Sequence, residues 1–518
     1  MKRLFRGLRD HPPRTSYDAV VVGSGVGGLV AANILARDGL SVLLVEQHYM
    51  VGGYCSTFRR AGFTFDASTH FYPLLGNPST LPGKLLADLG MTTRWVKMDP
   101  VDAFHFPDGS RFDVPADFEP YRARLDAEFP EEKEALDRFF EEVREAYLLG
   151  LLCYFRNRPT ERLGEYRDLT VRQALDRRFK SEKLKLLLTA DCPHWGSPPN
   201  RTSFVFDSML RLSYFLGNYY PEGGSQAFAD ELARCFESHG GEILMSSTVE
   251  RILMANGSAC GVEIETTRGP LKGRRRVSAG AVISNADLTT TWERLLGPGH
   301  LPPEFQGELR EMKKMRPSFP CFLSHIGLKD VDPEVLERAQ GYYWAHWDPD
   351  RVGRDGLICK IFVPTLFEPK LAPSGGQIVI LQKVQEMNYD EIEDWPGHKA
   401  QVEAFVTDQL ERVIPGIRRK IIVQTSASAA TAHRFTGNTA GSMLGWEMSP
   451  EQLGEARPGV VGPVPGLFQV GHWVRPGGGI TPVIISAMQV AEAVTGSWQP
   501  SLENAVGMNT GPLPPGRR

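Results

Sequence analysis

The first clear pattern in the chain is an apolar run, a stretch with helical spacing, and a second apolar run. Residues 19–22 are mostly β-branched, which is typical of a strand buried on both faces of a parallel sheet. Residues 29–37 place apolar side chains at helical intervals, and Gly39 stands where a helix would end. Residues 42–45 are apolar again. Strand, helix and strand in this order predict a Rossmann-type unit, and therefore an α/β fold.

Three glycines between the first strand and the helix form a Gly-x-Gly-x-x-Gly frame. Gly23 permits a tight turn, Gly25 lets the backbone approach a pyrophosphate, and Gly28 lets the helix pack close to the strand. Glu46 follows the second strand at the spacing where an acid binds a ribose hydroxyl. The chain has 52 glycines, so the frame alone would be weak, but here all parts occur in order. We predict a dinucleotide at the helix N-terminus; a glycine-rich loop without a ligand is the alternative.

Other segments extend this unit. Gly52 and Gly53 would let the chain pass close to the same dinucleotide. Residues 57–66 alternate like a hairpin that turns at residues 61–62. Near the C-terminus, a strand over 466–471 and a glycine turn precede an apolar helix over 484–494, so a second helix N-terminus would present free N–H groups.

Four sequence patterns together resemble the phytoene desaturase-like flavoproteins, a group that includes carotenoid desaturases, carotenoid cis–trans isomerases and retinol saturases. The patterns are V-G-S-G-x-G-G-L, L-x-V-E-Q, G-G-x-C-S-T-F and G-F-T-F-D, all within residues 22–66. The resemblance implies that the dinucleotide is FAD, whereas the spacing alone would equally allow NAD.

The resemblance also implies which residues contact the cofactor. The backbone of Val249 would pair with the adenine ring, and the C-terminal signature would contribute a strand-end glycine, Gly471. The family has aspartate after this glycine, and this chain has His472, which leaves the ribityl contact open. The expected cofactor-binding residues are Gly23, Gly25, Gly28, Glu46, Gln47, Gly52, Gly53, Val249, Gly471, His472, Gly479 and Ile480.

The resemblance and the two remote glycine turns predict a Rossmann-type FAD-binding domain interrupted by an α+β substrate domain with an antiparallel sheet. Residues 321–328, 358–364 and 377–384 alternate like strands of that sheet, and the glycine-rich stretch 433–442 is expected to be a loop. The expected division gives 15–100, 221–290 and 455–498 to the FAD-binding domain, 101–220 and 291–454 to a substrate or membrane-facing domain, and 1–14 and 499–518 to flexible tails.

An apolar and aromatic belt lies between residues 184 and 220. Half of it could be ordinary core, and the other half could line a tunnel for a long hydrocarbon or an entrance lying on a bilayer.

Composition narrows the function. With 42% hydrophobic and 23% charged residues, the 518-residue chain is an ordinary globular protein of more than one domain, and its net charge of −4 argues against nucleic acid. Seven scattered cysteines without a C-x-x-C pair fit a reducing compartment and argue against a structural metal site.

The N-terminus allows two interpretations. Its basic leader before an uncharged run imitates a secretory signal or a membrane span, but Asp18 and the glycine turn favour a buried Rossmann core. The leader itself could be a solvated tail or lie on an anionic membrane surface. We expect a cytoplasmic protein or one attached peripherally to the cytoplasmic face of a membrane.

No Ser–His–Asp order, H-E-x-x-H motif or paired-carboxylate motif is visible. The candidates for a catalytic acid or base are His70, Tyr219 and Tyr220, with His472 also beside a motif. For each, the alternative is a hydrogen-bonded structural residue.

The leading hypothesis is an FAD-dependent oxidoreductase that desaturates a carotenoid-like or other long isoprenoid polyene. Polyene isomerisation and retinol-type saturation are alternatives within the same fold. A non-catalytic flavin-binding chaperone and an amine oxidase-like enzyme are the others; the apolar belt speaks against an amine site.

Overall fold

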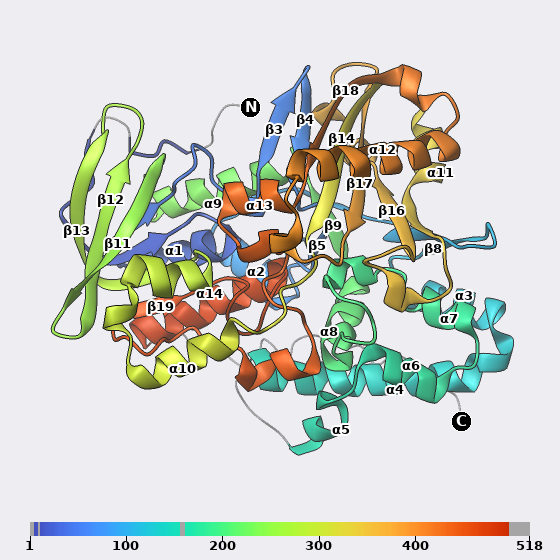
Figure 1. Cartoon of the computed structure of the whole chain (residues 1–518), viewed down its shortest axis with the longest axis horizontal. Coiled ribbons are helices and arrows are strands. Elements are labelled where there is room, and N and C mark those ends of the chain that lie inside the picture. Colours follow the sequence, from blue (N-terminus) through green and yellow to red (C-terminus); the bar gives the residue numbers. More distant parts are fainter. Residues whose placement is uncertain (1–4, 9–10, 156–160, 497–518) are drawn as a thin grey trace.

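Two seven-stranded sheets organise the chain, as the cartoon in Figure 1 shows. This computed structural model describes residues 5–8, 11–155 and 161–496. The predicted tail 499–518 lies outside the described residues.

The first sheet is a parallel Rossmann-type sheet with an antiparallel extension. Its order is β10 (Glu242–Leu244), β2 (Val42–Val45), β1 (Ser16–Val22), β13 (Gly273–Ser284), β12 (Ser258–Thr266) and β11 (Ser247–Ala255), and β19 (Leu467–Gln469) also pairs with β13. The long strand β13 pairs in parallel with β1 and β19 and antiparallel with β12. This sheet confirms the predicted α/β class.

Three helices are remote in sequence but lie together on this sheet. Helix α1 (Val26–Arg37) packs against both α9 (Ser225–Ser238) and α14 (Ile480–Thr495). Every residue of α1 from Val26 to Ala36 is buried, which explains why its sequence is apolar on all sides. The one polar side chain in its interior, Asn33, donates to the carbonyls of Leu29 and Leu232.

The second sheet carries the other half of the molecule. Its order is β18 (Ile421–Ala427), β14 (Cys321–Lys329), β17 (Gly376–Val384), β16 (Leu357–Phe362), β15 (Gly341–Trp344), β7 (Asp102–His105) and β8 (Arg111–Val114). All neighbours are antiparallel except β15 and β7. The antiparallel sheet is confirmed, with this one parallel pair. Helices α11 (Pro333–Ala339) and α12 (Trp395–Val413) belong to the same half.

A helical layer adjoins the second sheet. Helix α4 (Lys133–Gly150) runs along α8 (Phe204–Tyr214) and ends in a π-helical turn, Leu151–Phe155. Smaller helices surround the pair; they are α3 (Phe118–Glu128), α5 (Gly164–Arg167), α6 (Val171–Arg178) and α7 (Glu182–Leu187). Trp195 and Phe204 are completely buried in the core of this layer.

Short elements join the two halves. A three-stranded sheet has the order β5 (Tyr72–Pro73), β9 (Asn218–Pro221), β6 (Trp95–Lys97), and helix α2 (Leu81–Asp88) lies between β5 and β6 in sequence. The predicted hairpin is β3 (Thr57–Arg60) and β4 (Phe63–Asp66).

The packing differs from the predicted domain boundaries at two places. The β3–β4 hairpin packs on the second sheet, because Phe63 and Phe65 share a buried cluster with its strands. Conversely, the π-helical segment Thr290–Leu296 and α10 (Pro303–Met312) pack on the first sheet, where the Trp292 indole donates to Gln469 at 2.7 Å.

Two local predictions need correction. The stretch expected to be a loop over 433–442 begins inside helix α13 (Ala429–Thr436), which ends at Gly437 in the left-handed conformation. Part of the expected N-terminal tail is packed: Phe5 is 4% exposed, and the amide of Leu8 donates to the Ile243 carbonyl at 2.7 Å. The backbone amides of Arg6 and Gly7 also donate to the Glu237 carboxylate, so hydrogen bonds and the buried Phe5 hold this segment together.

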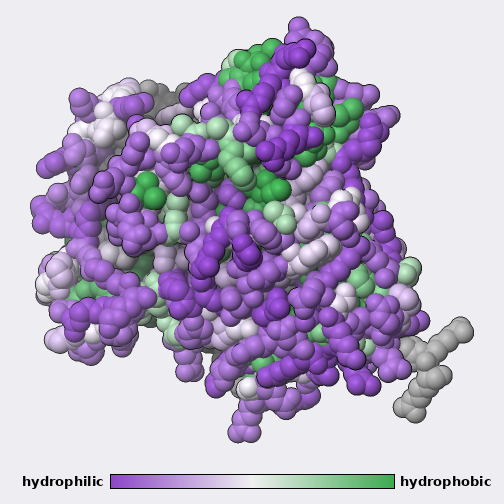
Figure 2. Space-filling model, turned by 45° about the vertical axis from the view of Figure 1, so that its right-hand side comes forward, coloured by the Kyte–Doolittle hydropathy of each residue, from purple (hydrophilic) through white to green (hydrophobic). Residues whose placement is uncertain are grey.

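Among the described helices, none combines the length and the apolar character needed to cross a bilayer. The face in Figure 2 is mostly hydrophilic, with hydrophobic residues in small separate groups.

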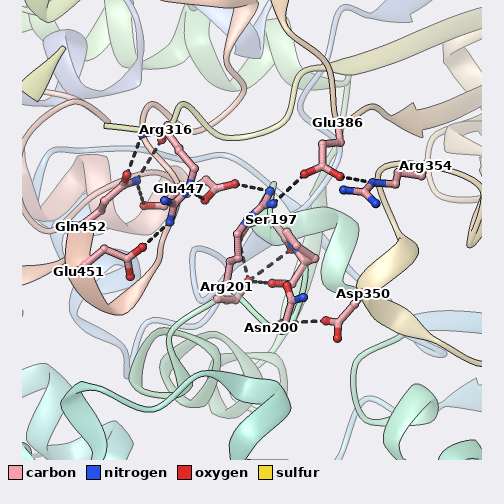
Figure 3. A network of polar contacts seen from close by, with 12 residues as sticks. Ser197, Asn200, Arg201, Arg316, Asp350, Arg354, Glu386, Glu447, Glu451 and Gln452 are labelled. Atoms are coloured by element: carbon pink, nitrogen blue, oxygen red, sulfur yellow. Dashed lines mark hydrogen bonds and ion pairs between the residues drawn. The ribbon is translucent and has the colours of Figure 1, made fainter. Parts of the chain in front are cut away.

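The buried carboxylate of Glu447 connects the loop before β19 to the segments before α8 and after α10 (Figure 3). Glu447 is 1% exposed and accepts from Arg201 and Arg316, each at 2.8 Å. Arg201 also donates to Glu386 at 2.7 Å. These four residues are far apart in sequence, so the network fixes the relative positions of the segments that carry them.

We predict that Glu447→Ala lowers the free energy of unfolding by about 1–3 kcal/mol, because two partly buried guanidinium groups lose their shared acceptor. The control is Glu451→Ala: the Glu451 side chain is 59% exposed, and an exposed pair contributes about 0–1 kcal/mol. Urea unfolding measures both variants. Equal losses would contradict the role given to Glu447.

Candidate functional site

A cavity of about 1450 Å³ is lined by residues from both halves of the molecule. Pockets for one drug-sized ligand measure roughly 300–1,000 Å³, so this one has room for a dinucleotide and a second molecule. Its wall contains the three glycine turns at 23–25, 52–53 and 471–479, the ends of the first-sheet strands and apolar side chains of α4 and α8.

The first two glycine turns lie against each other at the carboxyl edge of the first sheet. Gly25 and Gly52 form an isolated parallel bridge, and the Gly52 amide donates to the Ser24 carbonyl at 2.9 Å. Gly25 precedes α1, and no side chain caps this helix, so its first N–H groups are available to a ligand.

The space around Gly25 and Gly52 is too small for a Cβ unless a neighbouring group moves. A Cβ on Gly25 would lie 2.7 Å from Nδ2 of Asn285, and a Cβ on Gly52 would lie 2.7 Å from the Cys55 carbonyl oxygen. Gly28 does not line the cavity; it faces the Gly23 carbonyl and allows the close helix–strand contact expected of it.

Asn285 is a site residue that the sequence analysis missed. It follows β13, lines the cavity, and its side chain lies beside Gly25, Gly27 and Gly471. Its amide would meet a ligand held between the first and last glycine turns. The available signal was a polar residue directly after a buried parallel strand, where ligands of such sheets bind.

Glu46 lies where the ribose contact was expected. It is 8% exposed, and one carboxylate oxygen accepts from the Ser24 amide at 2.8 Å and the Ser24 hydroxyl at 2.6 Å. The other oxygen accepts from the His48 amide at 2.7 Å. These donors fix the carboxylate at the cavity wall, beside Gln47.

Val249 lies further along the same wall, on β11. Its strand is irregular between Val249 and Arg251, which interrupts the regular ladder next to the cavity.

The C-terminal turn approaches the first one through Asn285. Gly471 has φ +109°, and a Cβ there would lie 2.8 Å from the Asn285 Oδ1. Gly479 precedes α14, which also lacks a side-chain cap, and Ile480 begins this helix at the cavity wall.

His472 is a neutral acceptor where the family has an acid. Burial, and then the nearby Arg457 cation, lower the pKa of His472 to about 3. Its Nε2 lies 3.2 Å from the Asn438 Oδ1, which can only accept, so Nε2 carries the proton. Nδ1 is then left with a lone pair that can accept from a hydroxyl, as a carboxylate would.

Eleven of the twelve predicted cofactor residues therefore line one cavity, Gly28 being the exception. Two uncapped helix N-termini, a fixed carboxylate and glycines without room for a Cβ fit a dinucleotide with a pyrophosphate.

The other end of the cavity is mostly apolar. The predicted belt divides as expected: Leu184, Trp195 and Phe204 are core, whereas Phe206, Met209, Leu210 and Tyr214 line the cavity. Facing them are Leu148, Leu151 and Leu152 of α4 and its π-helical turn.

Of the three catalytic candidates, only His70 lines the cavity. His70 lines the cavity; burial, and then Lys360, lower its pKa to about 3, and its ring lies 3.2 Å from the Gln382 amide. Tyr219 and Tyr220 are not among the lining residues. Tyr220 is fully buried and donates to Asp66, and Tyr219 lies beside Gly76 and Trp95. Neighbours on a strand point to opposite faces, and neither face of β9 reaches the cavity.

Comparison with known proteins agrees with this geometry and places the chain among the flavoproteins. The profile of the flavin containing amine oxidoreductases matches residues 26–495. Prolycopene isomerase 1 of an Oncidium hybrid cultivar is 28% identical over 92% of this chain and 84% of its own length. All-trans-retinol 13,14-reductase of Rattus norvegicus is 29% identical over 69% of this chain and 60% of its own length.

Solved structures share the fold. An oxidoreductase from Methanosarcina mazei has a TM-score of 0.65 at 20% identity, covering 92% of this chain and 99% of that one. Putrescine oxidase with bound putrescine has a TM-score of 0.63 at 15% identity, covering 93% and 99%.

The chain belongs to the flavin containing amine oxidoreductase family. It is an FAD-dependent oxidoreductase, and FAD is its cofactor. The resemblance drawn from the sequence patterns is confirmed by its relatives.

We predict that Gly25→Val abolishes FAD retention, because its Cβ would occupy the space between the helix N-terminus and Asn285. Gly299→Ala is the control, since a Cβ there meets nothing within 4 Å. The flavin absorbance of purified, folded protein is the measurement. A yellow Gly25→Val protein would contradict the placement of the pyrophosphate.

We also predict that Glu46→Ala weakens FAD binding by about 1–3 kcal/mol, through lost charge-assisted hydrogen bonds to a ribose. Glu250→Ala, which removes an exposed charge next to Val249, should leave affinity unchanged. Titration of the apoprotein with FAD gives both dissociation constants; an unaltered value for Glu46→Ala would remove the ribose assignment.

Proposed function

We propose that this enzyme acts with FAD on a carbon–carbon bond of a carotenoid-like or other long apolar isoprenoid polyene. The observation that supports this most is an apolar chamber continuous with the dinucleotide part of the cavity. In this proposal the second sheet and the helical layer form the substrate domain.

The apolar lining of the chamber favours an uncharged hydrocarbon ligand over an amine. The wall formed by α4 and α8 contributes leucine, phenylalanine and methionine side chains, and none of the described residues there is charged. The histidines beside it, His70 and His194, have pKa values lowered chiefly by burial and are therefore neutral. An ammonium group in this chamber would be desolvated without a counter-charge, which is costly.

The residues that line the cavity would have separate roles in this reaction. Bound FAD would take up or return the electrons of the reaction. The side chains of α4 and α8 would hold the polyene along its length and exclude water, while the glycine turns fix the other end of the cavity. The first candidate reaction is desaturation, as the sequence patterns suggested.

Isomerisation of a polyene double bond is the second candidate. Two observations favour it: the relatives that match 92% of this chain are named prolycopene isomerases, and the neutral cavity histidines are weak bases. Isomerisation leaves the number of hydrogens unchanged and needs no residue that retains a proton.

We further propose that the protein binds a membrane surface peripherally, at the cytoplasmic face, to receive such a substrate. Leu148 and Leu152 both line the cavity and are 47% and 40% exposed, so they form an apolar rim at its edge. A water-insoluble chain could enter the chamber from a bilayer at this rim.

The test is product mass. Purified enzyme with oxidised or reduced FAD is incubated with phytoene, prolycopene, all-trans-lycopene and all-trans-retinol, and products are separated by chromatography. Loss of two hydrogens identifies desaturation, unchanged mass with altered retention identifies isomerisation, and gain of two identifies saturation. No conversion of any polyene, with rapid oxidation of an amine, would contradict the proposal.

A further inference from the structure

A chain of buried polar groups runs from the second sheet to the cavity. Nζ of Lys360 on β16 lies 2.7 Å from the Asp102 carboxylate on β7 and 3.1 Å from the Tyr342 hydroxyl on β15. The Tyr342 hydroxyl lies 2.7 Å from Nε2 of His194, and Nδ1 of His194 lies 3.1 Å from the Tyr214 hydroxyl on α8. These five groups come from five different elements of the chain, between residues 102 and 360.

The chemistry of these groups allows only one donor-to-acceptor direction along this chain of hydrogen bonds. The Lys360 ammonium can only donate, so Tyr342 accepts from it and donates its own proton to Nε2 of His194. Burial, and then Lys360, hold the pKa of His194 well below its usual value, so the ring is neutral and its single proton is on Nδ1. This proton is donated to the Tyr214 oxygen.

The Tyr214 hydroxyl completes the chain with a carboxylate. Its partner is the carboxyl group of Asp191, the residue just before the short helical turn Cys192–Trp195, and burial raises the pKa of both groups. Tyr214 therefore stands between a supply of protons at Lys360 and an acceptor at Asp191.

Only two members of the chain reach the cavity. Lys360 is 2% exposed and Tyr342 is completely buried, whereas His194 and Tyr214 line the cavity wall. Both nitrogens of His194 are engaged within this hydrogen-bond chain, whereas the Tyr214 oxygen keeps a second lone pair that can accept a proton from a ligand in the cavity. Tyr214 also packs edge-on against Phe71, beside His70.

We propose that Tyr214 exchanges a proton with the substrate, and that His194, Tyr342, Lys360 and Asp191 act behind it as positioning and relay residues. This inference rests on the proposed polyene chemistry and adds the proton-exchanging group that the sequence did not identify.

The exchange balances in both directions. When a hydrogen pair is removed, one carbon releases a proton to the Tyr214 oxygen while Tyr214 passes its own proton to Asp191; bound FAD would take up the remaining hydrogen with the electron pair. When a pair is added, Tyr214 protonates the carbon and takes a proton from Nδ1 of His194, which is replenished through Tyr342 from Lys360. Burial raises the pKa of Tyr214 well above its usual value, so it is never left ionised.

The first test needs no turnover. In protein labelled with ¹⁵N-histidine, the His194 signals are assigned by their loss in His194→Gln, and the nitrogen shifts report the tautomer. We expect the proton on Nδ1 and no titration between pH 5 and pH 9. A proton on Nε2 would reverse the direction of these hydrogen bonds and would overturn the inference, whatever the activity results.

The second test is turnover of the FAD-loaded enzyme with the polyene it converts. Tyr214→Phe should lower kcat about 10²–10⁴-fold, the usual contribution of a positioned acid or base, with a far smaller change in KM. Tyr343→Phe is the matched control, because the Tyr343 hydroxyl donates to the Ala339 carbonyl and takes no part in the hydrogen-bond chain from Lys360 to Tyr214.

The outcomes separate the two proposals. A wild-type enzyme that converts no polyene would contradict the proposed function while leaving the tautomer result to decide the chain. A wild-type enzyme that converts polyene, with Tyr214→Phe equally fast, would overturn the role of Tyr214 and leave the proposed function intact.

Discussion

The structure depends on the close approach of backbone segments at the carboxyl edge of the first sheet. Gly25 and Gly52 pair directly, Gly28 faces a carbonyl of the same turn, and Asn285 fills the gap toward Gly471. Apart from the Asn285 side chain, these segments leave no room for side chains, so the phosphates of a dinucleotide can meet backbone N–H groups at the N-terminus of α1. This contact brings together residues separated by more than 400 positions in the sequence.

The second half of the molecule is fixed to this edge by buried polar groups as well as by apolar packing. Glu447 connects Arg201 and Arg316, and Asp66 accepts from Tyr220 at the end of β4. These contacts keep the apolar wall of α4 and α8 in register with the cofactor end of the cavity. A reaction between two bound molecules needs such fixed placement more than it needs a strongly basic side chain.

The sequence predicted the parts that depend on local pattern. The glycine turn, the strands β1 and β2, three strands of the second sheet (β14, β16 and β17) and the C-terminal helix follow from periodicity and turn chemistry, and the structure confirms them. Asn285 was missed although its place directly after a buried strand marked it, whereas the hydrogen-bond chain from Lys360 to Tyr214 could not be predicted, because its members meet only through tertiary packing and no spacing marks them. Tyr219 and Tyr220 were chosen for their place beside a motif, but β9 directs one toward Asp66 and the other toward Gly76.

The central claim is that two remote glycine turns hold one FAD whose reactive end faces an apolar chamber. It is tested most directly by an anaerobic titration of the FAD-loaded protein with a polyene, followed through the flavin absorbance. The account predicts one FAD per chain and a saturable change in the flavin spectrum as the polyene enters. Folded protein that takes up no FAD, or FAD whose spectrum is indifferent to every bound polyene, would contradict it.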